Sequence, residues 1–99
     1  MKDFVWLGTK LKYLVEITTG GFSMENDDFN IVLSVGRKTR KFEKNELVND
    51  GEHFYLVFDT AEFCIGELNA TVTAYVPDTD FPDNIRTEVY KVRLTTIQS

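Results

Sequence analysis

The sequence is poor in the side chains that carry most enzyme and metal chemistry. Its 99 residues include one cysteine, Cys64, and one histidine, His53. A single cysteine excludes an internal disulfide, which suits a chain made in a reducing compartment. A catalytic triad or a structural zinc site needs more partners than these two residues supply. We therefore expect no catalytic residues, no cofactor and no enzyme activity.

Long hydrophobic runs are missing as well. No apolar stretch approaches the ~20 residues of a membrane helix. The first ten residues hold one run of four apolar side chains, so we expect no signal peptide. The formal net charge of −5 argues against a nucleic-acid partner. These absences favour a soluble binding or assembly module with neither nucleic acid nor membrane as a partner.

What the sequence does contain is apolar residues at every second position. The longest such series follows Gly66 and comprises Leu68, Ala70, Val72, Ala74 and Val76. This alternation predicts a half-buried strand. Pro77 ends the strand because proline cannot donate to a β-ladder, and a second strand returns from about Arg86. The segment 66–92 is thus predicted to be one long β-hairpin against which the other segments pack.

Shorter alternating segments predict further strands at 11–18, 29–35 and 53–59. Because each strand has one apolar face to bury, we predict an all-β fold, an antiparallel immunoglobulin-like β-sandwich of about seven strands. Residues 1–10 form an N-terminal apolar arm or first strand, and residues 11–99 form a single sandwich domain. A short helical turn capped by Thr60 and a fraying tail from Thr95 to Ser99 complete the prediction.

The segment Arg37 to Lys44 holds five of the eleven basic residues. Lysine-rich edge strands block unwanted edge-to-edge pairing, so we interpret this segment as a charged edge strand. Contact with an acidic partner and a nucleic-acid patch are weaker alternatives, because nucleic-acid binders usually add stacking aromatics.

Two segments are predicted to bind partners. The first is the run Phe4, Val5, Trp6 and Leu7, which contains the only tryptophan. It either covers the core of its own domain or docks on a neighbouring subunit, since tryptophan is a preferred interface anchor. The second is the tip of the long hairpin, where Phe81 and Ile85 lie.

The same tip contains the best metal candidates, Asp78, Asp80 and Asp83. Calcium is commonly bound by alternating carboxylates in a loop. The segment lacks the glycine and the closing glutamate of an EF-hand loop, and aspartate and asparagine are ordinary turn formers. We therefore favour a polar hairpin loop, with calcium binding as the weaker alternative.

A longer pattern runs through the hairpin and the turn before it. Its residues are Asp59-Thr60-Ala61, Gly66, Leu68, Ala70, Val72, Ala74-Tyr75, Pro77-Asp78, Asp80, Pro82-Asp83 and Arg86-Thr87-Glu88-Val89. This pattern resembles small virion structural proteins of phages and prophages that infect Bacteroidales (crAss-like phages). The opening residues Val5 to Lys10 are also similar to the start of those chains. A more distant likeness links the sequence to the immunoglobulin-like N-terminal domain of phage baseplate upper proteins.

The resemblance implies a non-enzymatic virion structural protein: a head fibre, a capsid decoration protein or a tail or baseplate adaptor. Its expected partners are other virion proteins (capsid, fibre or tail subunits), and it is expected to form a homo-oligomer. It would be made in the cytoplasm of the bacterial host and end in the virion. The alternative is a generic immunoglobulin-like adhesion or carbohydrate-binding module, with Tyr55 and Tyr75 exposed on strands that could be neighbours.

Overall fold

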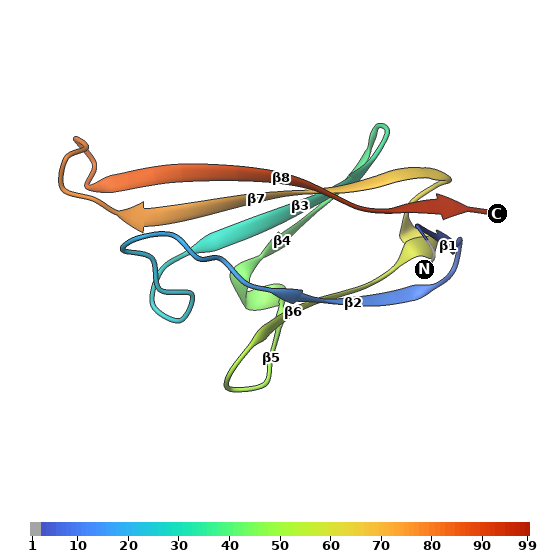
Figure 1. Cartoon of the computed structure of the whole chain (residues 1–99), viewed down its shortest axis with the longest axis horizontal. Helices are drawn as coiled ribbons and strands as arrows, with labels where there is room; N and C mark the ends of the chain where they lie inside the picture. The colour runs from blue at the N-terminus through green and yellow to red at the C-terminus, as the bar shows by residue number, and fades with distance from the viewer. Residues whose placement is uncertain (1–2) are drawn as a thin grey trace.

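Two β-sheets pack face to face in the computed structural model, which describes residues 3–99 (Figure 1). Within this range the five-stranded sheet has the order β1 (Phe4–Trp6), β8 (Ile85–Gln98), β7 (Gly66–Pro77), β3 (Phe29–Val35) and β4 (Lys38–Glu43). The three-stranded sheet has the order β2 (Lys10–Val15), β6 (Phe54–Asp59) and β5 (Val48–Asn49). Two 3₁₀ turns, η1 (Lys44–Glu46) and η2 (Thr60–Glu62), lie between strands.

The predicted all-β class is therefore confirmed, with two differences in detail. The described residues form eight strands, and β1 lies parallel to β8, so the sandwich is not wholly antiparallel. No helix within residues 3–99 is long and apolar enough to cross a membrane.

The core lies between the inner faces of β3 and β7 and the inner face of β6. Its members are fully or almost fully buried, as the alternation predicted; they include Phe29, Ile31, Leu33, Leu56, Phe58, Leu68, Ala74 and Val76. Burying one large apolar side chain of this kind stabilises the fold by about 1.5–3 kcal/mol. The rings of Phe29 and Phe54 meet edge to face across the two sheets, with centroids 5.6 Å apart.

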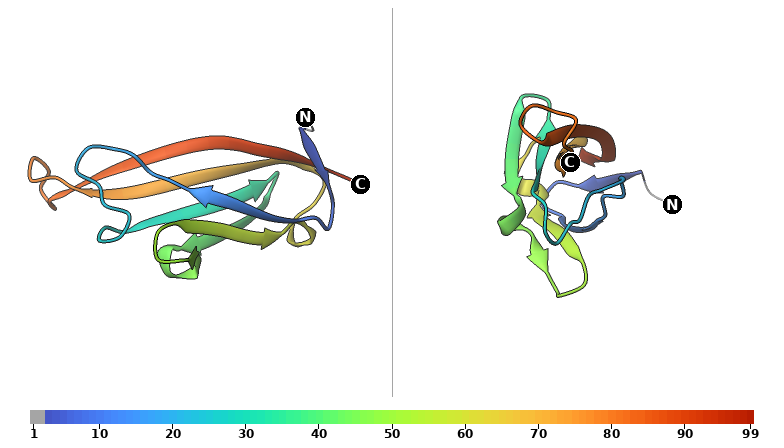
Figure 2. Two further views of the ribbon diagram at one scale, coloured as in Figure 1. Left: turned by 60° about the horizontal axis from the view of Figure 1, so that its bottom comes forward. Right: turned by 90° about the vertical axis from the view of Figure 1, so that its left-hand side faces the viewer.

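The β7–β8 hairpin spans the whole molecule, whose extents are 48 × 29 × 24 Å (Figure 2). A β-bulge interrupts its ladder: Leu68 pairs with Thr95, whereas Asn69 pairs with Arg93. The extra residue reverses which side chains face inward, and Thr95 and Ile97 become buried. The predicted fraying tail is therefore wrong, because β8 continues to Gln98 and β1 covers its outer edge there.

The predicted cap of the turn after β6 is also wrong. Asp59, not Thr60, is the N-cap residue, and its side chain accepts a hydrogen bond from the Ala61 N–H at 2.9 Å. The buried Thr60 hydroxyl instead donates to the Thr9 carbonyl at 2.8 Å and accepts from the Gly8 N–H at 2.9 Å. These two bonds fix the corner at which β1 leads into β2.

The predicted charged edge strand is confirmed as β4, which lies at one edge of the five-stranded sheet. Phe42 points into the core, and the Arg40 guanidinium lies 4.2 Å from the centre of its ring. Arg40 also forms an ion pair with Glu62. Charged side chains of this kind keep an exposed edge from pairing with another chain.

Candidate interaction surface

The N-terminal apolar residues form a strand on their own domain. In β1, Phe4 pairs with Thr96 of β8, and Val5 packs against the core. Trp6 remains 52% exposed, and its ring meets that of Phe4 edge to face at 5.3 Å. Leu7 is exposed beside it. The chain thus uses part of this segment internally and presents Trp6 and Leu7 to the solvent.

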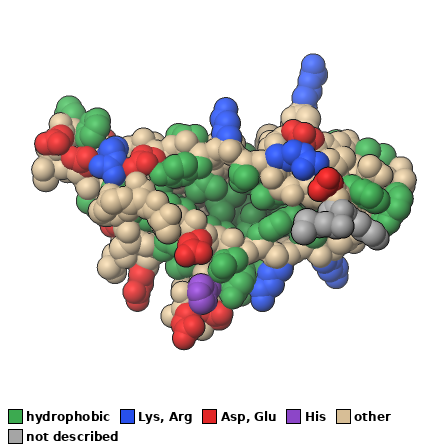
Figure 3. Space-filling view, viewed as in Figure 1, with side chains coloured by type: hydrophobic (Ala, Val, Ile, Leu, Met, Phe, Trp, Pro, Cys, Tyr) green, Lys and Arg blue, Asp and Glu red, His purple; other side chains and the backbone are tan. Residues whose placement is uncertain are grey.

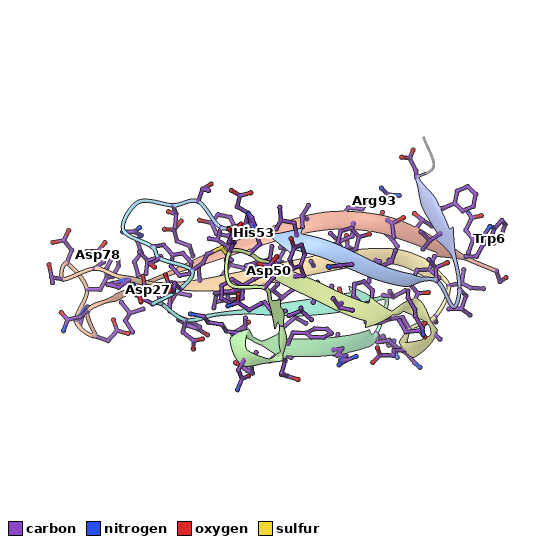
Figure 4. All side chains as sticks on the ribbon, turned by 90° about the horizontal axis from the view of Figure 1, so that it is seen from below. Trp6, Asp27, Asp50, His53, Asp78 and Arg93 are labelled. Atoms are coloured by element: carbon purple, nitrogen blue, oxygen red, sulfur yellow. The ribbon has the colours of Figure 1, made fainter. Side chains whose placement is uncertain are left out.

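The predicted hairpin tip lies at the opposite end of the molecule from Trp6 (Figure 4). Phe81 and Ile85 are both exposed there. A single chain therefore does not bring the two predicted contact segments together.

The carboxylates of the tip serve as turn acceptors. The Asp78 carboxylate accepts from the Asp80 N–H at 3.0 Å, and that of Asp83 accepts from the Ile85 N–H at 3.1 Å. The second oxygen of Asp78 binds Arg86 at 2.6 Å. Among residues 3–99, no three acidic, histidine or cysteine side chains are grouped so as to hold a metal ion. One oxygen of each of these two carboxylates therefore accepts from a local backbone donor, as is usual for aspartate in turns.

Arg86 joins the base of this tip to a distant turn. Its guanidinium binds Asp78 and also the Glu88 carboxylate, at 2.9 Å. It donates a third bond to the Gly20 carbonyl at 3.0 Å. Sequence reasoning missed this network because Gly20 lies 66 residues away in the chain and no local pattern announces the contact.

Hydrogen bonds in this network also lower the pKa values of its two carboxylates, Asp78 and Glu88. Glu88 accepts hydrogen bonds from Tyr90 at 2.6 Å and from Thr19 at 3.0 Å. The bonds from Tyr90, Arg86 and Thr19 lower the pKa of Glu88, and the bond to Glu88 raises the pKa of Tyr90. The Asp80 N–H and then the Arg86 guanidinium lower the pKa of Asp78. Both carboxylates are therefore held ionised at neutral pH.

An apolar hollow opens between the segment that follows β2 and strands β7 and β8, on one side of the sandwich (Figure 3). It has a volume of about 260 Å³ and is lined by Glu16, Ile17, Thr18, Val72, Tyr90 and Val92. An adjoining hollow of about 160 Å³ reaches Ile31 and Leu56 in the core. Val92 is 50% exposed although it shares the inward side of β8 with Tyr90 and Leu94. The two sheets are thus incompletely closed on this side.

One of the larger depressions contains both a serine and a histidine. It has a volume of about 440 Å³ and is lined by Ser23 and His53. Within the described chain, no hydrogen bond links the His53 imidazole to Ser23, whose hydroxyl accepts from the Asn26 N–H. A nucleophile activated by a base requires such a contact.

The two tyrosines proposed as a carbohydrate platform lie apart. Tyr55 belongs to β6 of the three-stranded sheet and Tyr75 to β7 of the five-stranded sheet. Lys12 lies over the Tyr55 ring at 4.3 Å, and the Tyr75 hydroxyl accepts from Asn30 at 3.3 Å. The expectation that their strands could be neighbours is wrong, because these strands belong to different sheets.

Comparisons with known proteins identify no relative of this chain. No family model, curated protein or solved structure matches it.

Proposed function

We propose that this chain is a non-enzymatic structural protein of a phage virion and acts through protein–protein contacts. The observation that carries the proposal is where its exposed apolar side chains lie. Most of them lie on edge strands or at the ends of the molecule, and these include Trp6, Leu7, Phe81, Ile85, Val89, Tyr90 and Val92; Val57, on the central strand β6, is an exception. Neighbouring exposed apolar side chains, such as Trp6 with Leu7 at one end and Tyr90 with Val92 on β8, are typical of protein contact surfaces. The assignment to a virion rests on the resemblance of the hairpin pattern to structural proteins of phages.

The finer fold proposal is an immunoglobulin-like sandwich. In that fold, strands B, E and D lie in one sheet with strand A, and C, F and G lie in the other. The strand orders support this proposal: β2, β6 and β5 would correspond to B, E and D, and β3, β7 and β8 would correspond to C, F and G. β4 extends the second sheet beside β3, as in variable-type domains. The departure is β1, which pairs with β8 and leaves the outer edge of β2 uncovered among the described residues.

A compact domain of this kind suits a head fibre, a capsid decoration protein or a tail or baseplate adaptor. Its partners would be other virion proteins (capsid, fibre or tail subunits) and further copies of itself. We propose Trp6 and Leu7 at one end, and Phe81 and Ile85 at the other, as contact residues. The chain would be made in the cytoplasm of the bacterial host before assembly.

Purified particles test the proposal. Phage particles from a host that carries the gene are banded by density, and their proteins are quantified by mass spectrometry. We expect the chain at a fixed copy number relative to the major capsid protein. Its presence in the host cell fraction and absence from the particles would contradict the proposal.

A pair of variants tests the contact residues. Trp6→Ser should lower the amount of chain in the particles, whereas Leu14→Ser should leave it unchanged. Leu14 is the matched control because it is also a large exposed apolar residue, on β2. Equal incorporation of the two variants would remove Trp6 from the contact.

A further inference from the structure

The outer edge of β8 is unpaired over most of its length. Among residues 3–99, β1 pairs with β8 only from Thr96 to Gln98, and no strand pairs with the outer edge from Ile85 to Arg93. Nine residues of strand present about 30 Å of backbone. Unpaired backbone N–H and C=O groups along such an edge are a template for another strand.

This edge is longer and less densely charged than β4 at the opposite side of the sheet. β4 carries Lys38, Arg40 and Lys41 in six residues. β8 instead exposes Val89, at 55%, on the outer face of the sheet, and Tyr90 and Val92 on the inner face. Charged residues (Arg86, Glu88, Lys91 and Arg93) lie between these apolar ones along the same stretch. A long unpaired edge that exposes apolar side chains on both faces can pair with another chain.

We propose that a second copy of this chain covers the edge, with the two β8 strands antiparallel across a two-fold axis. Side chains alternate between the two faces of a strand, and directly opposed residues of an antiparallel pair lie on the same face of the sheet. The inner faces of both copies therefore lie on the same side of the joined sheet only if the two-fold axis passes through a residue, which then faces the same residue of the second copy. The unpaired stretch Ile85–Arg93 has Val89 at its midpoint. A register centred on Val89 pairs every residue of this stretch with the second copy. The paired stretch then ends at Arg93, whose guanidinium contacts the carbonyl of Asp3 just before β1.

In this register no two like charges face each other. Val89 faces Val89 of the second copy, and Glu88 faces Tyr90, repeating across the strands a pairing that Glu88 already makes within its own strand. Thr87 faces Lys91. A shift of the axis to Glu88 or to Lys91 would place like charges directly opposite, which is destabilising. A register centred on Tyr90 would place Val89 opposite Lys91, so charged substitutions at residue 89 distinguish it from the register centred on Val89.

The same contact accounts for two other features of the surface. The apolar hollow is lined by Tyr90 and Val92 of β8, so a strand added to β8 would lie beside its mouth. Ile85 of the second copy would end opposite Arg93, about 10 Å from Thr96, where β1 begins. The tip with Phe81 of one copy would then lie at the same end of the dimer as Trp6 of the other copy.

This inference goes beyond the virion proposal and does not depend on it. A monomer in solution would overturn the pairing and leave the virion proposal to the particle experiment. A chain missing from the particles would leave the pairing to the experiments below.

Charged substitutions at Val89 test the pairing by sedimentation equilibrium of the full chain. We expect the wild-type chain to be a dimer. Val89→Lys alone and Val89→Glu alone should each lower the affinity of the dimer by about tenfold or more. A mixture of the two variants should recover the affinity. The lysine and glutamate then face each other across the axis. Val48→Lys and Val48→Glu are the matched controls, because Val48 is 48% exposed on the short edge strand β5, and both should dimerise like wild type.

Three results would overturn the proposal. A wild-type chain that stays monomeric at millimolar concentration excludes the dimer. Val48 variants that weaken association as much as Val89 variants do exclude β8 as its interface. A Val89→Glu chain that associates more tightly than wild type places residue 89 opposite Lys91 and excludes the Val89 register.

A disulfide provides a second measurement. Directly opposed Cα atoms in an antiparallel pair are about 4.5–5.5 Å apart, within the range a disulfide can span. In a Cys64→Ser background, which removes the exposed native thiol, Val89→Cys should form a covalent dimer on oxidation, and Val48→Cys should not. Equal and slow cross-linking of the two variants would contradict the pairing.

Discussion

The two halves of β8 share one strand and differ in their surroundings. From Ile85 to Arg93 the strand has one described neighbour, β7, whereas from Thr96 to Gln98 it lies between β7 and β1. Val89 and Val92 are half exposed in the first part, and Ile97 is fully buried in the second. The alternation of apolar residues shows which side chains share a face. The neighbouring strands decide whether that face is covered.

The presence or absence of a second neighbouring strand gives the two halves of β8 different roles. The covered half belongs to the folding core, and the uncovered half is available for contact. The substitutions below separate these roles, beginning with the largest expected effect.

Truncation in the two halves should have unequal costs. Ile97→Ala should lower the free energy of unfolding by about 3 kcal/mol, since it leaves a cavity in the core. Val92→Ala should lower it by less than about 1 kcal/mol, because the side chain is half exposed. Both are measured by urea unfolding in the Val89→Lys background, which we expect to be monomeric. Equal costs would show that the two halves do not differ.

The corner that holds β1 over the covered half should be the next most sensitive. Thr60→Val removes the hydroxyl that bonds Gly8 and Thr9 and should cost about 1–3 kcal/mol. The fluorescence of Trp6, the only tryptophan, should also change in this variant, because Trp6 lies in β1. Thr39→Val, at an exposed position of β4, is the control and should change neither quantity. An unchanged stability of Thr60→Val would mean that β1 is held by other contacts.

Acid should loosen the Arg86 network at the base of the tip. The folded-state pKa values of Asp78 and Glu88 lie below their ordinary values, so their contribution is complete above about pH 5 and is lost as pH falls through the folded pKa values. Glu88→Gln should therefore flatten the fall of the urea midpoint between pH 6 and pH 3. An identical slope in the variant would show that Glu88 is not part of this pH dependence.

The β4 edge should be the least sensitive site. Lys41→Ala removes an exposed ion pair with Glu43 and should change stability by less than about 0.5 kcal/mol. It should also leave the dimer unchanged, since Lys38 and Arg40 still charge the edge. Association through β4 in this variant, detected by sedimentation, would show that a single lysine protects that edge.

Much of the fold follows from local pattern. The alternation predicted which side chains of β3, β6 and β7 face the core, and Pro77 ends β7 as predicted. The bulge beside Leu68 could not be predicted, because one extra residue in a strand has no distinct signature in the sequence. That bulge reverses the inward side of the last residues and turns a predicted tail into core.

The candidate surface was only partly predictable. Trp6, Leu7, Phe81 and Ile85 are exposed, in keeping with their selection as contact residues, which stays a prediction. The uncovered edge of β8 was missed because Tyr90, Val92 and Leu94 alternate like a buried face. Val89, on the opposite face, was the available signal, since apolar residues on both faces indicate either a central strand or an uncovered edge.

Amide hydrogen exchange as a function of protein concentration compares the two halves of β8 most directly. In an antiparallel pair, alternate residues direct their N–H groups toward each neighbour, so about half of the amides between Ile85 and Arg93 point to the uncovered side. We predict that these amides exchange quickly in dilute protein and become protected as the concentration rises. The amides from Thr95 to Gln98 should stay equally protected throughout. Edge amides whose exchange does not change with concentration would contradict the contact role of this half of the strand.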